Sequence, residues 1–119
     1  MNILLADDNT MLRELLEEFL RGLKHTVLAA EDGLKALEIY NSSTAIDLLI
    51  TDIIMPGING IELAKTVRID EPEMPIIIIS GFAQQDTYKQ VFSLNAKIYE
   101  KPVDLRVLKS HIESLQQEK

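Results

Sequence analysis

The sequence contains no cysteine among its 119 residues. This absence excludes a disulfide framework, a thiolate metal site and a thiol nucleophile. It also fits a reducing compartment, and we therefore expect the protein to be cytoplasmic.

Long hydrophobic runs and positive charge are also scarce. No run approaches the roughly 20 apolar residues that a membrane-spanning helix needs, and the N-terminus MNILLADD lacks the basic start and cleavage site of a signal peptide. The chain has 12 Lys and Arg against 19 Asp and Glu, a formal net charge of -7. Because its basic residues are scattered, we expect neither nucleic acid nor a membrane as a partner.

The length and composition that remain are those of one folded domain. A chain of 119 residues has the usual size of a single domain, and its 46% hydrophobic and 26% charged residues are sufficient for a sizeable core. No repeat, low-complexity tract or linker divides the chain. We predict one domain over residues 1–119.

Short apolar runs alternate with longer segments of helical period, a pattern typical of a parallel sheet covered by helices on both faces. The predicted strands are Asn2–Ala6, Thr26–Ala30, Asp47–Thr51, Pro75–Ile79 and Ala96–Glu100. The predicted helices begin at Asn9 or Thr10, span Gly33–Tyr40, begin at Asn59 or Gly60, span Gln84–Ser93 and follow a cap at Asp104. The fourth helix carries few apolar residues, so we expect it to bury little surface and to be mobile.

Five strand-helix units joined by right-handed crossovers make a doubly wound sheet most economically. We therefore predict an α/β fold of the flavodoxin-like (βα)5 type, with five parallel strands in the order 2-1-3-4-5. In such sheets, ligands bind at the carboxyl ends of the strands, where the strand order reverses.

Polar residues of the right types follow these predicted strands. Asp7 and Asp8 follow the first strand, Asp52 the third, Ser80 the fourth and Lys101 the fifth, so all five converge on one edge. Three carboxylates brought together repel one another and raise one another's pKa unless a cation neutralises them. An oxygen-only set of few ligands, with no His or Cys nearby, selects Mg²⁺, and Mn²⁺ could substitute.

A carboxylate held beside Mg²⁺ and a lysine ammonium can attack a phosphoryl group, because this reaction needs positioning and charge neutralisation above all. Asp52 is the best candidate for the nucleophile, since it lies alone at the end of the central strand and leaves Asp7 and Asp8 for the metal. Ser80 can donate a hydrogen bond to a phosphoryl oxygen.

Together, Asp7-Asp8, the segment DIIMPGINGIEL around Asp52, Ser80-Gly81 and Lys101-Pro102 resemble the response regulator receiver family over the whole chain.

The resemblance implies that Asp8 and Asp52 bind Mg²⁺ directly, that the Ile54 carbonyl is a third protein ligand and that Asp7 acts mostly through water. It implies that Lys101 pairs with the phosphoryl group. It further implies a cis peptide bond between Lys101 and Pro102, which X-Pro bonds permit.

The family's function would be phosphoryl transfer in a two-component or phosphorelay system. The resemblance implies Mg²⁺-dependent transfer to Asp52 from a histidine kinase or histidine phosphotransfer protein, followed by a conformational switch. A downstream protein would read the switch on residues 84–117. The chain would be a signalling phosphoacceptor that catalyses its own phosphorylation and slow dephosphorylation, rather than an enzyme acting on other substrates. Because the sequence ends after the last helix, we expect either no effector domain or an excised domain.

Two positions depart from the family pattern. Ile98 stands where relatives carry an aromatic three residues before the lysine, and Tyr99 follows it, on the opposite face of the strand by alternation. Ile54 and Phe82 stand where relatives often carry polar groups near the hydrolytic water. We hypothesise that these apolar side chains slow dephosphorylation.

Other interpretations are possible for the same fold. A flavodoxin-type electron carrier would need a Ser/Thr/Gly-rich phosphate loop where this chain has Asp7 and Asp8. A metal-dependent phosphatase would typically carry an added cap, for which 119 residues leave no room. A receiver that is never phosphorylated could serve as a binding module only. We expect His25 and His111 to be exposed or capping residues without a functional role.

Overall fold

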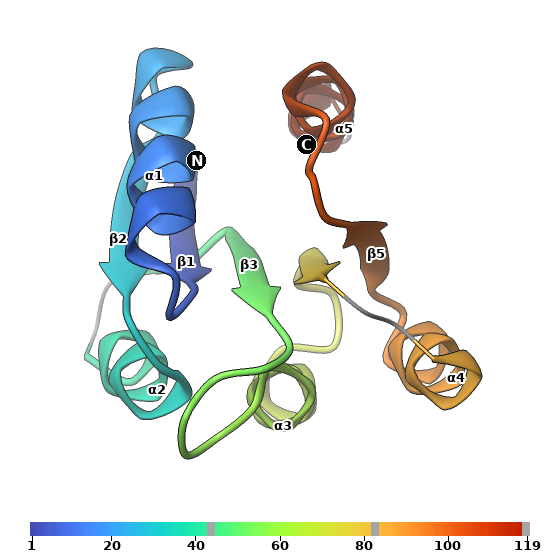
Figure 1. The fold of residues 1–119 in the computed structure, drawn as a ribbon. Helices are drawn as coiled ribbons and strands as arrows, with labels where there is room; N and C mark the ends of the chain where they lie inside the picture. Colours follow the sequence, from blue (N-terminus) through green and yellow to red (C-terminus); the bar gives the residue numbers. More distant parts are fainter. Residues whose placement is uncertain (43–44, 82–83, 118–119) are drawn as a thin grey trace.

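The computed structural model describes residues 1–42, 45–81 and 84–117, in which strands and helices alternate along the chain (Figure 1). The strands are β1 (Asn2–Ala6), β2 (Thr26–Ala30), β3 (Leu48–Asp52), β4 (Ile76–Ser80) and β5 (Lys97–Glu100). The helices are α1 (Thr10–Gly22), α2 (Gly33–Tyr40), α3 (Gly60–Asp70), α4 (Gln85–Ser93) and α5 (Leu105–Gln117).

The five strands form one parallel sheet in the order β2-β1-β3-β4-β5, which confirms the predicted fold class and topology. The chain moves outward from β1 to β2 and then returns to place β3 on the other side of β1. The order therefore reverses between β1 and β3, and their carboxyl ends are the expected place for a ligand.

Helices cover both faces of the sheet, as Figure 1 shows, with α1 and α5 on one face and α2, α3 and α4 on the other. Alternate residues of each strand serve the two layers. In β4, Ile77 and Ile79 pack with Leu16 of α1 and Leu108 of α5, whereas Ile78 packs with the opposite cluster. The sheet is buried on both sides, which explains why its central strands are almost wholly apolar.

Asparagine and aspartate side chains cap the first residues of α1, α2, α3 and α5. The Asn9 side chain accepts a hydrogen bond from Leu12 N and caps α1, while Asn59 forms a capping box with Glu62 at the start of α3. Asp32 caps α2 in the same way, and the Asp104 carboxylate accepts hydrogen bonds from two amides of α5. The sequence left two positions open at α1 and α3, and in both the asparagine is the cap.

Three strands differ from the prediction by one residue at one or both ends. The observed β3 and β4 each begin and end one residue later, and β5 begins at Lys97. Pro75 has no N–H to donate to a ladder, so β4 begins after it. Asp52 and Ser80 are consequently the last residues of their strands rather than the first loop residues, and the sheet register fixes their directions.

Helix α4 is the least anchored of the helices. Val91 is its one buried residue, and its N-cap, Gln84, makes no side-chain capping hydrogen bond. The expectation that this helix buries little surface is confirmed. Its mobility stays a prediction.

The expectation for His25 is wrong, because this side chain is buried and only 7% exposed. Its Nδ1 lies 3.1 Å from the α-amino group of Met1, which donates a hydrogen bond to it. The N–H of Thr26 donates to the Met1 carbonyl, so the pairing of two separate strands brings Met1 beside the ring, which local sequence does not reveal. His111 is half-buried and is hydrogen-bonded to Tyr99.

Across the described residues, no helix combines the length and the apolar composition that crossing a membrane requires.

Candidate functional site

The predicted residues meet at the carboxyl edge of the sheet. Asp52 ends β3 and is paired in register with Ile79, the neighbour of Ser80. The backbone N–H of Lys101 donates a hydrogen bond of 2.8 Å to the Ser80 carbonyl, which places the residue after β5 beside the end of β4. The strand ends therefore bring together residues that are far apart in the sequence.

Lys101 is the cation of this edge. Its Nζ lies 2.9 Å from Oδ2 of Asp52 and 3.9 Å from Oδ2 of Asp7. The Asp52 and Asp7 side chains are almost fully enclosed, so solvent screens these charges less than it would at the surface. The peptide bond between Lys101 and Pro102 is cis, as the family resemblance implied.

The three carboxylates sit at different depths. Asp7 is buried, and this burial raises its pKa above the usual value. The Asn9 N–H bond acts in the opposite direction, while the negative charge of Asp52 adds to the increase. Asp8 is exposed at the outer side of the group. Asp7 is thus held in an environment that disfavours its own charge.

The donor set suits a small divalent cation. One carboxylate oxygen from each of Asp7, Asp8 and Asp52 lies within 4.8 Å of the other two. Magnesium binds oxygen at about 2.1 Å, so two oxygens on the same ion lie at most roughly 4.2 Å apart, which is close to the spacing of these three oxygens. The ligands are all oxygens and one of them faces solvent, which leaves space for the water ligands that Mg²⁺ retains.

Asp52 is held from several directions. Its Oδ1 accepts a hydrogen bond of 2.7 Å from the N–H of Ile53, and the Thr51 hydroxyl donates to its carbonyl at 2.8 Å. Gly60 packs so closely that an added Cβ would lie 1.9 Å from the Asp52 carbonyl oxygen. The first residue of α3 therefore fixes the end of β3, a role that the sequence analysis did not assign to Gly60.

Two further residues, to which the sequence analysis gave no role at this edge, contact Asp7. The N–H of Asn9 donates to Asp7 Oδ1 at 2.9 Å, and Nη1 of Arg13 donates to the Asp7 carbonyl at 2.9 Å. Helical side chains point back toward the N-terminus, so an arginine one turn into a helix can reach the loop before it. That direction was the available signal for Arg13.

The structure describes three of the four positions named above as departures from the family pattern or neighbours of one: Ile54, Ile98 and Tyr99. Ile54 is 71% exposed, and Phe82 lies outside the described residues, so their proposed effect on dephosphorylation stays a hypothesis. The Ile54 carbonyl likewise stays a predicted ligand. Ile98 packs on the α3 and α4 side of the sheet and Tyr99 on the α1 and α5 side, which confirms that they face opposite ways.

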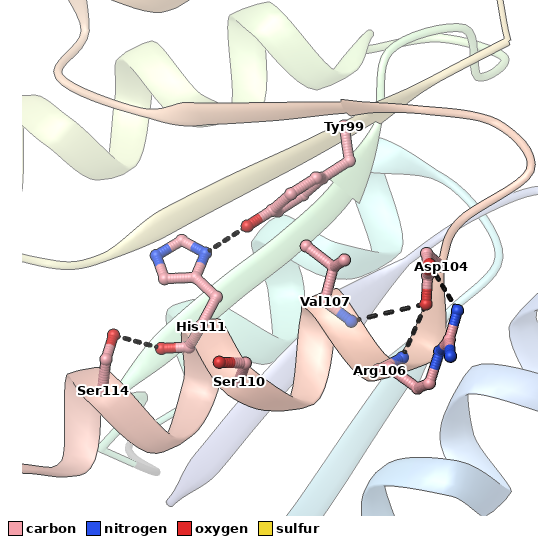
Figure 2. Close-up of a pocket in the computed structure, with 7 residues that line it drawn as sticks. All are labelled: Tyr99, Asp104, Arg106, Val107, Ser110, His111 and Ser114. Atoms are coloured by element: carbon pink, nitrogen blue, oxygen red, sulfur yellow. Dashed lines mark hydrogen bonds and ion pairs between the residues drawn. The ribbon is translucent and has the colours of Figure 1, made fainter.

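Tyr99 lines a separate hollow of about 540 Å³ along α5, shown in Figure 2. Its hydroxyl is hydrogen-bonded to His111 Nδ1 at 2.9 Å. None of the six predicted site residues lines this hollow. The chemistry of the acidic edge is therefore separate from the β5 and α5 face that Tyr99 occupies.

The sequence of this chain is similar to those of a known protein family. The family model of the response regulator receiver domain matches residues 3–113. Chemotaxis protein CheY of Pseudomonas aeruginosa is 35% identical, over 97% of this chain and 95% of that protein. Response regulator RR06 of Streptococcus pneumoniae is also 35% identical, over 97% of this chain. The chain spans 52% of the length of RR06.

The structure of this chain is also similar to solved structures of receiver domains. A response regulator receiver domain protein from Clostridium thermocellum superposes with a TM-score of 0.90 at 25% identity, over 98% of this chain and 94% of that one. The agreement covers all five strand-helix units rather than a fragment of the sheet.

Proposed function

Because this chain belongs to the response regulator receiver family, we propose that Asp52 accepts a phosphoryl group from a phosphohistidine and that the modified domain signals to a partner protein. The observation that carries the proposal is the position of Asp52, with Lys101 Nζ at 2.9 Å and the Asp7 and Asp8 carboxylates beside it. This is the arrangement that carboxylate attack on phosphorus requires.

In the proposed transfer, a carboxylate oxygen of Asp52 forms a new bond to phosphorus while the bond from phosphorus to the donor imidazole nitrogen breaks. The electron pair of that bond stays on the nitrogen. Lys101 holds a positive charge beside the attacking carboxylate and faces the phosphoryl oxygens as negative charge moves onto the protein. The domain supplies position and charge, and the donor supplies the activated phosphoryl group.

In this proposal Asp8 and Asp52 would hold the metal directly, together with the Ile54 carbonyl, and Asp7 would act through water. When bound, Mg²⁺ or Mn²⁺ supplies the positive charge that offsets these carboxylates and the phosphoryl oxygens.

The output would follow from new contacts to the aspartyl phosphate. Ser80 and Lys101 would reorganise toward the phosphoryl oxygens, and the two-state surface formed by residues 84–117 would be biased by that change. The sparse anchoring of α4, in which Val91 alone is buried, supports this part of the proposal. A downstream protein would bind this surface.

The phosphodonor would dock beside Asp8, on the first turns of α1. Met11 is 83% exposed and lines a hollow of about 440 Å³ with Leu12, Leu15 and two glutamates. Exposed apolar side chains next to the proposed acceptor favour contact with a helix of the donor protein, which would be a histidine kinase or a histidine phosphotransfer protein. The cytoplasmic location and the absence of nucleic acid and membrane partners remain predictions of the sequence.

The decisive experiment is incubation with acetyl phosphate and Mg²⁺, followed by intact-mass measurement. We expect the mass to increase by one phosphoryl group, and we expect no increase for Asp52→Asn or in the presence of excess chelator. Labelling that persists in Asp52→Asn would remove Asp52 from the role of acceptor. Wild-type protein that takes up no phosphoryl group from acetyl phosphate or from a phosphohistidine donor would instead favour a binding module.

A further inference from the structure

Every polar group of Asp7 is engaged, and one partner comes from outside the acidic edge. Its N–H donates to the Ala30 carbonyl at 3.1 Å, its Oδ1 accepts from Asn9 and its Oδ2 faces Lys101. Its carbonyl oxygen accepts a hydrogen bond of 2.9 Å from Nη1 of Arg13, in the first turn of α1.

The Asp7 carbonyl needs this donor because the strand ends before it. The last paired residue of β1 is Ala6, which is in register with Ala30 of β2 and Thr51 of β3. Asp7 is only 1% exposed, so water cannot readily replace a strand partner. A buried carbonyl without a donor costs about 1–3 kcal/mol, and the guanidinium of Arg13 avoids that cost.

Fixing this carbonyl also fixes the next residue. The Asp7 carbonyl and the Asp8 amide share one planar peptide group, so a bond to the oxygen sets the plane from which Asp8 departs. Asp8 is exposed, and packing therefore does not hold it. Arg13 on the carbonyl and Asn9 on the carboxylate of Asp7 are contacts from α1 and its cap that hold this loop.

Because Arg13 donates to a carbonyl, it does not occupy the carboxylate oxygens that a cation would bind. None of the ion pairs formed among residues 1–42, 45–81 and 84–117 involves Arg13. An arginine bound to a carboxylate would compete with a metal for its oxygens, whereas one bound to a carbonyl does not. The half-buried guanidinium stabilises the loop without occupying a ligand.

We propose that Arg13 is a positioning residue for the metal: by holding the peptide group between Asp7 and Asp8, it aims the Asp8 carboxylate at the cation. This inference rests on the proposed function, since it concerns how the cation of the phosphoryl-transfer site is bound. Removal of a group that orients a metal ligand typically costs about 10-fold to 100-fold in metal affinity.

The test compares Arg13→Gln and Arg13→Lys with Arg106→Gln, which changes the net charge equally at a side chain that is 93% exposed. Mg²⁺ affinity is measured by calorimetric titration, and phosphorylation by acetyl phosphate is measured as a function of Mg²⁺ concentration. We expect Arg13→Gln to weaken Mg²⁺ binding about tenfold and to lower the phosphorylation rate at low Mg²⁺ while leaving the saturated rate within about threefold. Arg106→Gln should match the wild type.

Three results would overturn the proposal. One is an unchanged Mg²⁺ affinity in a folded Arg13→Gln protein. Another is a loss of Mg²⁺ affinity in Arg13→Gln that disappears at high salt and is absent from Arg13→Lys, since charge alone would then explain it. The third applies if Arg13→Gln does not fold: it is an Arg13→Lys protein that binds Mg²⁺ with wild-type affinity. The proposed function fails separately, if wild-type protein binds Mg²⁺ and takes up no phosphoryl group.

Discussion

The ammonium group of Lys101 lies 2.9 Å from a carboxylate oxygen of Asp52, although 49 positions separate the two residues in the sequence. This contact joins the end of β5 to the end of β3, across the intervening strand β4. Lys101 supplies positive charge to the same carboxylates that the proposed cation would bind. In the proposed function, the two cations would compete for the acids before transfer and would both face the phosphoryl oxygens during it.

Replacement of Lys101 should separate these effects. In Lys101→Ala the acids lose a neutralising charge, so we expect Mg²⁺ to bind several-fold more tightly, while phosphorylation by acetyl phosphate slows about 100-fold. Calorimetric titration and the rate of mass gain measure the two quantities. Lys101→Arg is the control and should keep near wild-type Mg²⁺ affinity. A Lys101→Ala protein that is phosphorylated as fast as the wild type would contradict the role of this lysine.

Replacement of Gly60 should damage the site by moving the backbone of β3. A Cβ at Gly60 would lie 1.9 Å from the Asp52 carbonyl oxygen, so α3 and β3 must separate in Gly60→Ala. We expect urea unfolding to show a loss of about 1–3 kcal/mol or more, with slower phosphorylation of Asp52.

The matched control for Gly60 is Gly22→Ala, at the end of α1, where an added Cβ meets nothing within 4 Å. This replacement should be neutral or should stabilise the protein by up to about 1 kcal/mol, because alanine favours the helix. Equal effects of the two replacements on stability would argue against close packing at Gly60.

Arg68 should be a stability residue for α4 and its connection to β5. Its guanidinium donates to the carbonyls of Glu71 and Pro72 after α3 and of Leu94 and Asn95 after α4. We expect Arg68→Ala to lower the free energy of unfolding by about 2 kcal/mol, since it leaves these carbonyls without their donor.

Urea unfolding measures the loss in Arg68→Ala, and amide hydrogen exchange shows whether protection falls at the end of α4. Arg106→Ala, which removes a highly exposed arginine, is the reference and should change stability by less than about 0.5 kcal/mol. A similarly small change for Arg68→Ala would show that water replaces its hydrogen bonds.

His25 should make stability depend on pH. Burial, together with the nearby Met1 amine, lowers its pKa from the usual 6.5, so the folded state keeps the ring neutral where the unfolded state already binds a proton. Its contribution is therefore fully present above about pH 6.5 and is lost as the pH falls toward the lower pKa of the folded state.

Urea unfolding of untagged, metal-free wild type and His25→Gln at several pH values tests this expectation. The wild type should lose up to about 1.4 kcal/mol more per pH unit below pH 6.5, and the difference between the two curves removes the carboxylates' common contribution. Parallel curves between pH 5 and pH 7 would mean that His25 titrates alike in both states.

Much of the fold could be predicted because its signals are local and periodic. The apolar runs of β1 and β2 were predicted to the residue, and the alternation of strands with helices implied the sheet order. The one-residue errors at β3 and β4 arose because apolarity does not show where ladder pairing begins. His25 could not be placed, since its contact with Met1 is made by residues 24 positions apart in the sequence.

The sequence by itself determined the topology and the residues at the acidic edge, because periodic burial fixes the strands and a parallel sheet brings all their carboxyl ends together. Only the tertiary structure decided how those residues are supported. The carbonyls that receive the Arg13 hydrogen bond and adjoin Gly60 belong to backbone groups, and any residue type carries such groups. A sequence pattern records side chains, whereas these supporting contacts depend on how closely separate elements approach.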